Sequence, residues 1–139
     1  MAIIDVDNLK EVNDRFGHIA GDSALQRLAE CMNNQKRKVD ILARYGGDEF
    51  VFILPHTSSE EAAKMIERIQ QKIRQVCIGD NYFMKVSCGI AQTLPGKPII
   101  PTELISKADI ALYQAKQAGR DCIRIWNEDT AHKSKVISE

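Results

Sequence analysis

Apolar and polar residues follow two different periods along this chain. Continuous or alternating apolar runs predict strands, whereas apolar residues three and four positions apart predict helices. We expect strands at 2–4, 41–45, 50–54, 82–91 and 122–125 and helices at 9–16, from Asp22 or Ser23 to about 32, from 57 to about 76 and at 102–118. The order β-α-α-β-β-α-β-α-β predicts an α/β (α+β) layer with a mixed central sheet that contains a β-hairpin, flanked by helices.

Local signals set the expected ends of these elements. Gly17 is expected to stop the first helix and Gly119 the last, and the Ser/Thr-then-acid pattern at 57–60 is expected to start the third. The apolar face of the third helix is expected to comprise Ala62, Ile66, Ile69, Ile73 and Val76. Within the strand at 82–91, the apolar residues Val86, Cys88 and Ile90 occupy alternate positions.

The segment Arg44-Tyr45-Gly46-Gly47-Asp48-Glu49-Phe50 separates two apolar runs and predicts a β-hairpin with its turn at Gly46-Gly47. Glycine permits a positive φ and leaves room for a large ligand beside the backbone. Adjacent carboxylates next to that space indicate a divalent cation or a proton acceptor. An ordinary turn with solvated acids explains the hairpin equally well.

A second acidic segment follows the first strand, where Asp5 is expected at or near the strand end. If this strand lies beside the hairpin, Asp5 and Asp48 can converge. Oxygen ligands with room for phosphate oxygens suit Mg²⁺ better than zinc. The alternative is that Asp5 caps the next helix, which is a common role for Asp.

Composition limits the class of protein. The 139 residues suffice for one domain with a real core, and 44% hydrophobic residues are typical of a globular protein. Lys and Arg together number 19, as do Asp and Glu, so no net basic charge indicates nucleic acid or an anionic membrane as a partner. No apolar run approaches a membrane-spanning length, and no signal peptide is expected. Cys31, Cys77, Cys88 and Cys122 are expected as small core residues in a reducing cytosol.

The order of several motifs resembles one known family. The matching segments are Asp5-Val6-Asp7-Asn8-Leu9-Lys10, Asn13-Asp14, 17–22, 44–50, Ser87-Cys88-Gly89-Ile90-Ala91 and 108–116. Together they closely resemble the GGDEF family, the bacterial diguanylate cyclases, from about residue 2 to about residue 126. The resemblance implies a palm-like nucleotide-cyclase fold in a domain at 1–127, with a polar tail at 128–139 that we expect to fray.

The resemblance also implies roles for individual residues. The metal, Mg²⁺ or Mn²⁺, would be held by Asp5, Asp48 and the backbone carbonyl of Val6, with Glu49 either metal-linked or assisting deprotonation. Which of the catalytic residues Asp48 and Glu49 handles the proton is left open, and Gly46 and Gly47 would lie near the substrate. The guanine readers would be Asn13 and Asp22. The phosphate contacts would be Lys10, Lys116 and Arg120, beside N–H groups expected to face the phosphates at Asn8, Leu9 and Lys10. Without the resemblance, the cations would be read as complementing helix ends.

The implied reaction condenses two GTP into cyclic di-GMP and two pyrophosphates across a homodimer of domains, with product inhibition at an R-x-x-D site formed by Arg37 and Asp40. The alternative for that site is a basic turn before a strand. The rival function is a non-catalytic module that binds cyclic di-GMP or GTP. A third possibility is an interaction domain that has lost activity.

The resemblance implies a wider context as well. Family members normally carry a segment before the first strand with an Asp-x-Leu-Thr turn and an Asn-Arg-Arg helix, so we expect a truncated or naturally shortened domain. A fused sensor or regulatory domain is expected in a parent protein. That protein could be membrane-anchored, although this domain is expected in the cytoplasm without membrane or nucleic-acid contact.

Overall fold

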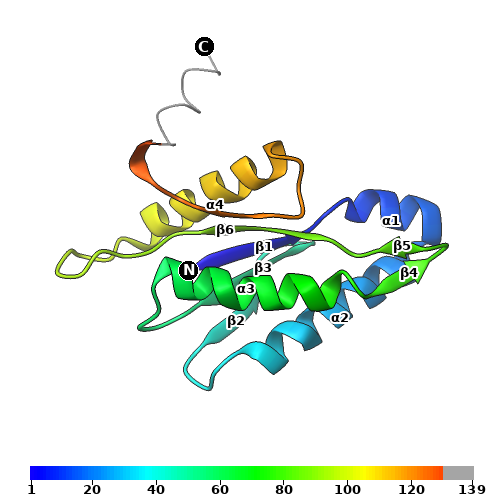
Figure 1. Cartoon of the computed structure of the whole chain (residues 1–139), viewed down its shortest axis with the longest axis horizontal. Coiled ribbons are helices and arrows are strands. Elements are labelled where there is room, and N and C mark those ends of the chain that lie inside the picture. The colour runs from blue at the N-terminus through cyan, green and yellow to red at the C-terminus, as the bar shows by residue number, and fades with distance from the viewer. Residues whose placement is uncertain (130–139) are drawn as a thin grey trace, which may run out of the picture.

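A five-stranded mixed sheet organises the chain, and the computed structural model describes it over residues 1–129 (Figure 1). The sheet comprises β1 (Ala2–Val6), β2 (Ile41–Arg44), β3 (Glu49–Ile53), β6 (Val86–Ile90) and β7 (Ile123–Ile125). The helices are α1 (Leu9–Phe16), α2 (His18–Gln35), α3 (Ser59–Ile73) and α4 (Pro101–Gln117). A separate two-stranded sheet comprises β4 (Cys77–Gly79) and β5 (Tyr82–Phe83). The expected order of elements is confirmed, with β4 as an addition.

Strand β1 lies at the centre of the sheet. The strand order is β2-β3-β1-β6-β7, and β1 pairs antiparallel with both β3 and β6, whereas β6 and β7 are parallel. The predicted hairpin of β2 and β3 is present and pairs Ile41 with Ile53 and Arg44 with Phe50. The strand with the first acidic segment therefore lies directly beside the hairpin, as its predicted role requires.

Helices cover the sheet on both faces. Figure 1 shows α2 and α3 on one side of the sheet and α4 on the other. Ile4 and Phe52 belong to the core under α2 and α3, whereas their neighbours Ile3 and Val51 pack in the core under α4. Adjacent strand residues point to opposite faces, so every residue of β1 and β6 is buried. The alternating apolar residues of β6 fill one core, and α4 buries the residues between them.

The start of α3 follows the predicted capping pattern. Ser58 Oγ accepts a hydrogen bond from the Glu61 N–H at 3.2 Å, and the Glu61 carboxylate accepts one from the Ser58 N–H at 2.8 Å. This reciprocal capping box satisfies two backbone donors that the helix itself leaves unpaired. The expected buried face of α3 is confirmed up to Ile73, but Val76 lies beyond the end of the helix.

The second helix starts earlier than the sequence predicted. It begins at His18, and neither Asp22 nor Ser23 caps it. Gly17 adopts a φ of 88°, which breaks α1 from α2 within a single residue. The segment 18–21 before Asp22 is therefore helical rather than a loop.

The strand predicted at 82–91 is divided, and a hairpin precedes β6. Asp80 and Asn81 both have a positive φ, and the two residues link Gly79 of β4 to Tyr82 of β5. A two-residue turn with both φ values positive matches the right-handed twist of a hairpin. Strand β6 then starts at Val86, where pairing with β1 begins.

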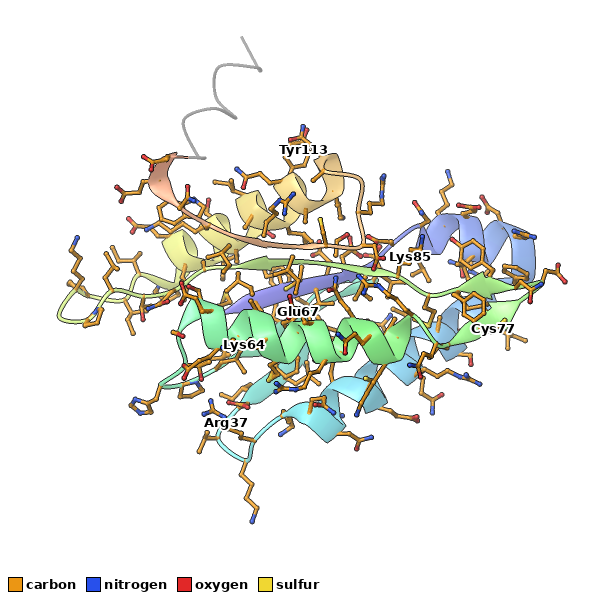
Figure 2. The ribbon with its side chains drawn as sticks, viewed as in Figure 1. Arg37, Lys64, Glu67, Cys77, Lys85 and Tyr113 are labelled. Carbon is orange, nitrogen blue, oxygen red and sulfur yellow. The ribbon has the colours of Figure 1, made fainter. Side chains whose placement is uncertain are left out.

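The cysteines follow the prediction only in part. All four cysteines are free, and Cys88 is buried as expected, but Cys77 is exposed on β4, so its assignment to the core was wrong. Figure 2 shows Cys77 at the end of the molecule that holds this hairpin.

Most of the predicted tail, 130–139, lies outside the described residues. No helix within 1–129 is long and apolar enough to cross a bilayer.

Candidate active site

Asp5 on β1 lies directly opposite Glu49 on β3 in the sheet register. Asp48 comes immediately before Glu49, and its backbone carbonyl accepts a hydrogen bond from the Val6 N–H at 3.3 Å. The antiparallel pairing of β1 and β3 therefore brings the two predicted acidic segments together. Asp5 lies inside β1, and Asn8 occupies the N-cap position of α1, so the alternative of Asp5 as a helix cap was wrong.

The carboxylate of Asp5 is buried and only half satisfied. Its side chain is 5% exposed, and Oδ2 accepts a hydrogen bond from Lys116 Nζ on α4. Among the described residues Oδ1 has no hydrogen-bond partner. Burial raises the pKa of Asp5 to about 6, with Lys116 opposing this rise and Asp48 adding to it.

Two further acids face the same lysine. Burial raises the pKa of Glu49, and the charge of Asp109 on α4 adds to that rise while Lys116 opposes it. Burial also raises the pKa of Asp109 against the effect of Lys116. One lysine therefore faces four acids, and a cation bound here would favour their ionised forms.

The donor set fits a magnesium ion that shares its ligands with a substrate. Within residues 1–129 no three His, Cys, Asp or Glu side chains are grouped closely enough to form a complete protein site for a metal. Mg²⁺ commonly binds through one or two carboxylates and takes its other ligands from water and substrate phosphates. Asp5 supplies an unpaired buried oxygen, and Asp48 lies near enough to add to the rise of its pKa.

The Gly-Gly turn is open, but not for the reason predicted. Neither Gly46 nor Gly47 adopts a positive φ, so the turn does not depend on a left-handed glycine. A Cβ added at Gly47 would meet no atom within 4 Å. Arg44 fixes the turn, since its guanidinium donates to the Gly46 carbonyl at 3.2 Å and to the Gly47 carbonyl.

The predicted phosphate contacts come from two places. Asn8 adopts a left-handed φ of 57° and turns the chain from β1 into α1, so that Leu9 and Lys10 form the first turn of that helix. No side chain caps this helix start, which leaves backbone N–H groups facing outward. Lys116 lies on α4 beside Asp5, but Arg120 lies beyond the end of α4 with a φ of 66°. Lys116 and Arg120 therefore do not share one helical face.

The predicted guanine readers lie where α1 meets α2. Asn13 Oδ1 is buried and has no partner among the described residues. It lies so close to Gly21 that a Cβ added there would stand 1.8 Å from it. Asp22 follows Gly21 directly and is exposed. This junction therefore combines an unpaired buried acceptor with an exposed carboxylate.

Sequence reasoning gave no role to Asp7 or Ser87, which the structure places beside this site. Both are buried, and the Ser87 hydroxyl donates to Asp7 Oδ1 at 2.7 Å. The spacing of Asp7 two residues after Asp5 was a signal, but only the fold shows that Asp7 pairs with β6.

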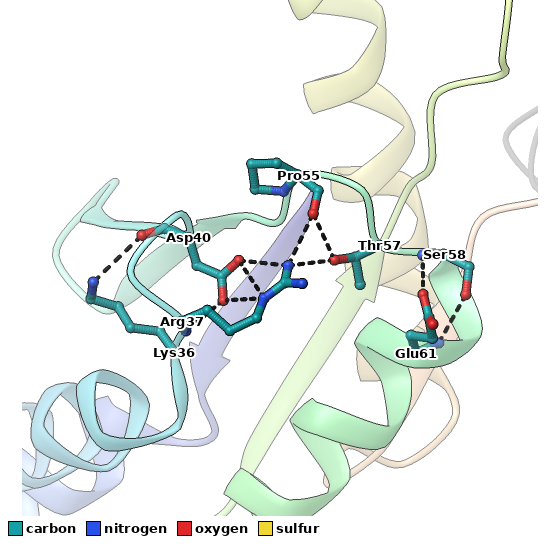
Figure 3. A network of polar contacts seen from close by, with 7 residues as sticks. All are labelled: Lys36, Arg37, Asp40, Pro55, Thr57, Ser58 and Glu61. Atoms are coloured by element: carbon teal, nitrogen blue, oxygen red, sulfur yellow. Dashed lines mark hydrogen bonds and ion pairs between the residues drawn. The ribbon is translucent and has the colours of Figure 1, made fainter.

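Arg37 and Asp40 are brought together, in an ion pair (Figure 3). Arg37 Nη2 donates to Asp40 Oδ1 at 2.8 Å, to the Pro55 carbonyl at 2.9 Å and to Thr57 Oγ1 at 2.6 Å. The Arg37 side chain is 52% exposed and that of Asp40 is 0% exposed. Figure 2 shows Arg37 far from Lys85, whose carbonyl accepts from the Asp7 N–H, so this pair is separate from the carboxylates.

The family model described as "Diguanylate cyclase, GGDEF domain" matches residues 1–122 of this chain. The chain belongs to the GGDEF family. Diguanylate cyclase DgcP of Pseudomonas aeruginosa is 37% identical over 128 residues, which cover 90% of this chain and 19% of that protein. The chain thus spans about a fifth of the length of this relative.

Solved GGDEF structures share the fold. The active GGEEF domain of a diguanylate cyclase from Vibrio cholerae superposes with a TM-score of 0.84 at 31% identity, over 91% of this chain and 81% of that one. The GGDEF domain of DgcB from Caulobacter crescentus, in complex with c-di-GMP, gives 0.82 at 28% identity, over 89% and 75%. The expected palm-like cyclase fold is therefore confirmed.

Proposed function

We propose that this GGDEF domain is a diguanylate cyclase that condenses two GTP into cyclic di-GMP and two pyrophosphates. The observation that carries the proposal is a pair of buried oxygens, Asp5 Oδ1 and Asn13 Oδ1, that have no partner among the described residues. A buried polar atom without a partner costs free energy, so a fold keeps one where a ligand completes it. One lies among the carboxylates and the other at the helix junction, as a nucleotide that bridges metal and base sites would require.

Asp5, Asp48 and the Val6 carbonyl would hold Mg²⁺, with Mn²⁺ as a substitute, and Glu49 would lie next to it. When bound, the ion neutralises charge on the phosphates and lowers the pKa of the attacking hydroxyl. The Asp5 oxygen that Lys116 leaves unpaired supports this assignment.

The phosphates would lie between α1 and the end of α4. The uncapped N–H groups at Asn8, Leu9 and Lys10 favour an anion. The side chains of Lys10, Lys116 and Arg120 add positive charge. Because Lys116 already pairs with Asp5, we propose that it links the metal ligand to the triphosphate.

Guanine would bind at the α1–α2 junction. Its Watson–Crick edge offers N1–H and N2–H₂ donors, which a carboxylate such as that of Asp22 accepts together. Asn13 supplies a further acceptor at the same junction. Adenine lacks this donor pair, and a site with polar groups left unpaired discriminates strongly against the wrong base.

In each condensation step the 3′-hydroxyl oxygen of one GTP forms a bond to the α-phosphorus of the other, and the bond to pyrophosphate breaks. The hydroxyl proton goes to a carboxylate. Asp48 and Glu49 are the two candidates for this carboxylate. A second, equivalent step closes the ring.

One domain offers one GTP site, so two domains would face each other with approximate two-fold symmetry. The reacting geometry then exists only between protomers. We further propose that the parent protein carries a sensor or regulatory domain that controls this pairing. The GTP substrate favours a cytoplasmic location.

Arg37 and Asp40 form the proposed inhibitory product site. The half-exposed Arg37 guanidinium can stack on guanine or fork onto a phosphate. Asp40 is buried against Arg37 in this conformation, so the pair must open before Asp40 can accept from a guanine edge.

The test is chromatography of the products formed from GTP with Mg²⁺, beside the Asp48→Ala/Glu49→Ala variant and beside ATP as substrate. Cyclic di-GMP formed only from GTP, and only by the unaltered domain, is the expected result. Tight cyclic di-GMP binding without any product would support the rival proposal, a non-catalytic receptor. Absence of both would overturn both proposals and leave an interaction domain.

A further inference from the structure

Asp7 is a buried acid whose two oxygens are both engaged by the protein itself. Its Oδ1 accepts from the Ser87 hydroxyl at 2.7 Å, and its Oδ2 accepts from the Asp121 N–H at 2.9 Å. Its own N–H donates to the Lys85 carbonyl at 2.9 Å. Asp7 is 6% exposed and Ser87 is fully buried. The residue thus joins the end of β1 to β6 and to the turn that follows α4.

That turn has an unusual backbone. Gly119, Arg120 and Asp121 have φ values of 104°, 66° and 48° in succession. Glycine adopts such values at little cost, but for an ordinary residue the left-handed region is strained. Two such residues in a row persist only where surrounding contacts hold them.

Four hydrogen bonds hold the Asp121 end of the turn. The Asp121 N–H is bound by Asp7, and the Asp121 carboxylate accepts from Arg74 Nε at 3.1 Å and 3.0 Å. Arg74 Nη2 also donates to the Asp121 carbonyl at 3.3 Å. The Asp7 contact is part-buried, whereas the three Arg74 contacts are exposed, and the Arg120 N–H is held separately by the Ala115 carbonyl at 3.1 Å. Asp7 is therefore the better shielded of the two side chains that restrain Asp121.

We propose that Asp7 is a positioning residue for Arg120: it fixes the left-handed turn from which Arg120 reaches the substrate phosphates. This inference rests on the proposed function for the role of Arg120, but not for the restraint on the turn. Each oxygen of Asp7 already accepts from a donor of the protein, whereas Asp5 keeps one oxygen without a partner among the described residues, so Asp5 is the better candidate for a metal ligand. Asp7 comes two residues after Asp5. The proposed metal ligand and the residue that restrains the Arg120 turn therefore belong to one short segment of the chain.

Asp7→Asn distinguishes positioning from metal binding. Asparagine keeps a carbonyl oxygen for the Asp121 N–H, and its amide can donate to the Ser87 hydroxyl oxygen. Asp7→Ala removes both contacts. A positioning role therefore predicts that GTP binding with Mg²⁺ is kept in Asp7→Asn and weakened in Asp7→Ala. A metal-ligand role predicts that binding is weakened in both variants.

The first measurement is amide hydrogen exchange at Asp121, which needs no nucleotide. We expect protection in the unaltered domain and in Asp7→Asn, and its loss in Asp7→Ala, with thermal unfolding confirming that each variant is folded. Unchanged protection in folded Asp7→Ala would overturn the inference. If Asp7→Ala does not fold, Ser87→Ala replaces it. Ser87→Ala should weaken the protection of the Asp121 amide, and full protection in that variant would overturn the inference.

The second measurement is calorimetric binding of GTP with Mg²⁺, including Arg120→Ala and the double variant. Asp7→Ala should weaken binding about tenfold alone but less than about twofold in the Arg120→Ala background, because coupled residues are not additive. Additive losses would overturn the link to Arg120. If the unaltered domain bound no GTP while Asp121 exchange behaved as expected, the proposed function would fail and the restraint would stand.

Discussion

The Lys116 ammonium on α4 donates a hydrogen bond to the carboxylate of Asp5 on β1, across 111 positions of the chain. This contact ties the helix that covers one face of the sheet to the central strand. It leaves one oxygen of Asp5 free in a buried place. The account of function depends on that free oxygen, because it marks where a cation would bind.

The raised pKa of Asp5 predicts a pH dependence of stability without metal. Its pKa is about 6 in the folded domain and ordinarily 3.8, so the folded state binds the proton more tightly. The contribution of Asp5 to stability should then be greatest below about pH 4 and decrease as the pH rises to about 6. After a discount for partial solvent screening, the change is on the order of 1 kcal/mol.

Urea unfolding with EDTA at pH 5 and pH 7 measures this effect, and Asp5→Asn is the control. The contribution of Asp5 should vanish in Asp5→Asn, which should also lose Mg²⁺-dependent GTP binding. An identical pH profile in the two proteins would contradict the assignment.

Lys116→Met should lower kcat/KM for GTP. The variant removes the counter-charge of Asp5 and one phosphate contact, and a partly exposed charged hydrogen bond of this kind contributes roughly a factor of ten. Lys107→Met is the matched control, since Lys107 lies on the same helix but over the Trp126 ring. Steady-state kinetics in which both variants behave alike would show that Lys116 has no specific role.

Gly21→Ala should weaken GTP binding by about tenfold while leaving the fold intact. The new Cβ would stand 1.8 Å from Asn13 Oδ1, which is the end of a side chain that can rotate away. The displaced amide would no longer present its acceptor to guanine. Calorimetry beside Ser23→Ala, an exposed position on the same helix, measures the loss, and unchanged affinity in Gly21→Ala would remove Asn13 from the base site.

Arg37→Ala should destabilise the domain at neutral pH. Burial alone would raise the pKa of Asp40, but the hydrogen bonds from Arg37 outweigh it and lower that pKa below its ordinary 3.8. The stabilisation from this pair is present above about pH 4 and is lost as the pH falls through the folded pKa. The difference in unfolding free energy between the two proteins should therefore shrink on acidification.

Lys38→Ala, which changes an exposed neighbour, is the control for this comparison. Equal stability of Arg37→Ala and the unaltered domain at pH 7 would show that the ion pair is not structural. Loss of product inhibition in Arg37→Ala must be compared with this change in stability, because the same residue anchors Pro55 and Thr57.

Much of the fold was predictable because its signals are local. The capping box at Ser58 and Glu61 marks the start of α3, and the apolar runs around the Gly-Gly turn mark the hairpin. The β4–β5 hairpin was missed because it depends on left-handed φ values at Asp80 and Asn81, which a short apolar run does not reveal.

The site was predictable only where its residues share a motif. The meeting of Asp5 and Glu49 follows once β1 is placed beside the hairpin, and motif order made that placement plausible. The roles of Asp7 and the turn at Arg120 were not predictable, because they depend on hydrogen bonds between segments more than a hundred residues apart. The contacts of Arg37 with Pro55 and Thr57 likewise come from a segment distant in sequence, which the R-x-x-D pattern does not reveal.

The most direct test of the central claim is the rate of cyclic di-GMP formation from GTP and Mg²⁺ over a range of protein concentrations. The account predicts a rate that rises faster than linearly at dilute protein, and no product from Asp48→Ala/Glu49→Ala at any concentration. A strictly linear rate would contradict catalysis between two domains. Product from the doubly substituted domain would contradict the assignment of the active site.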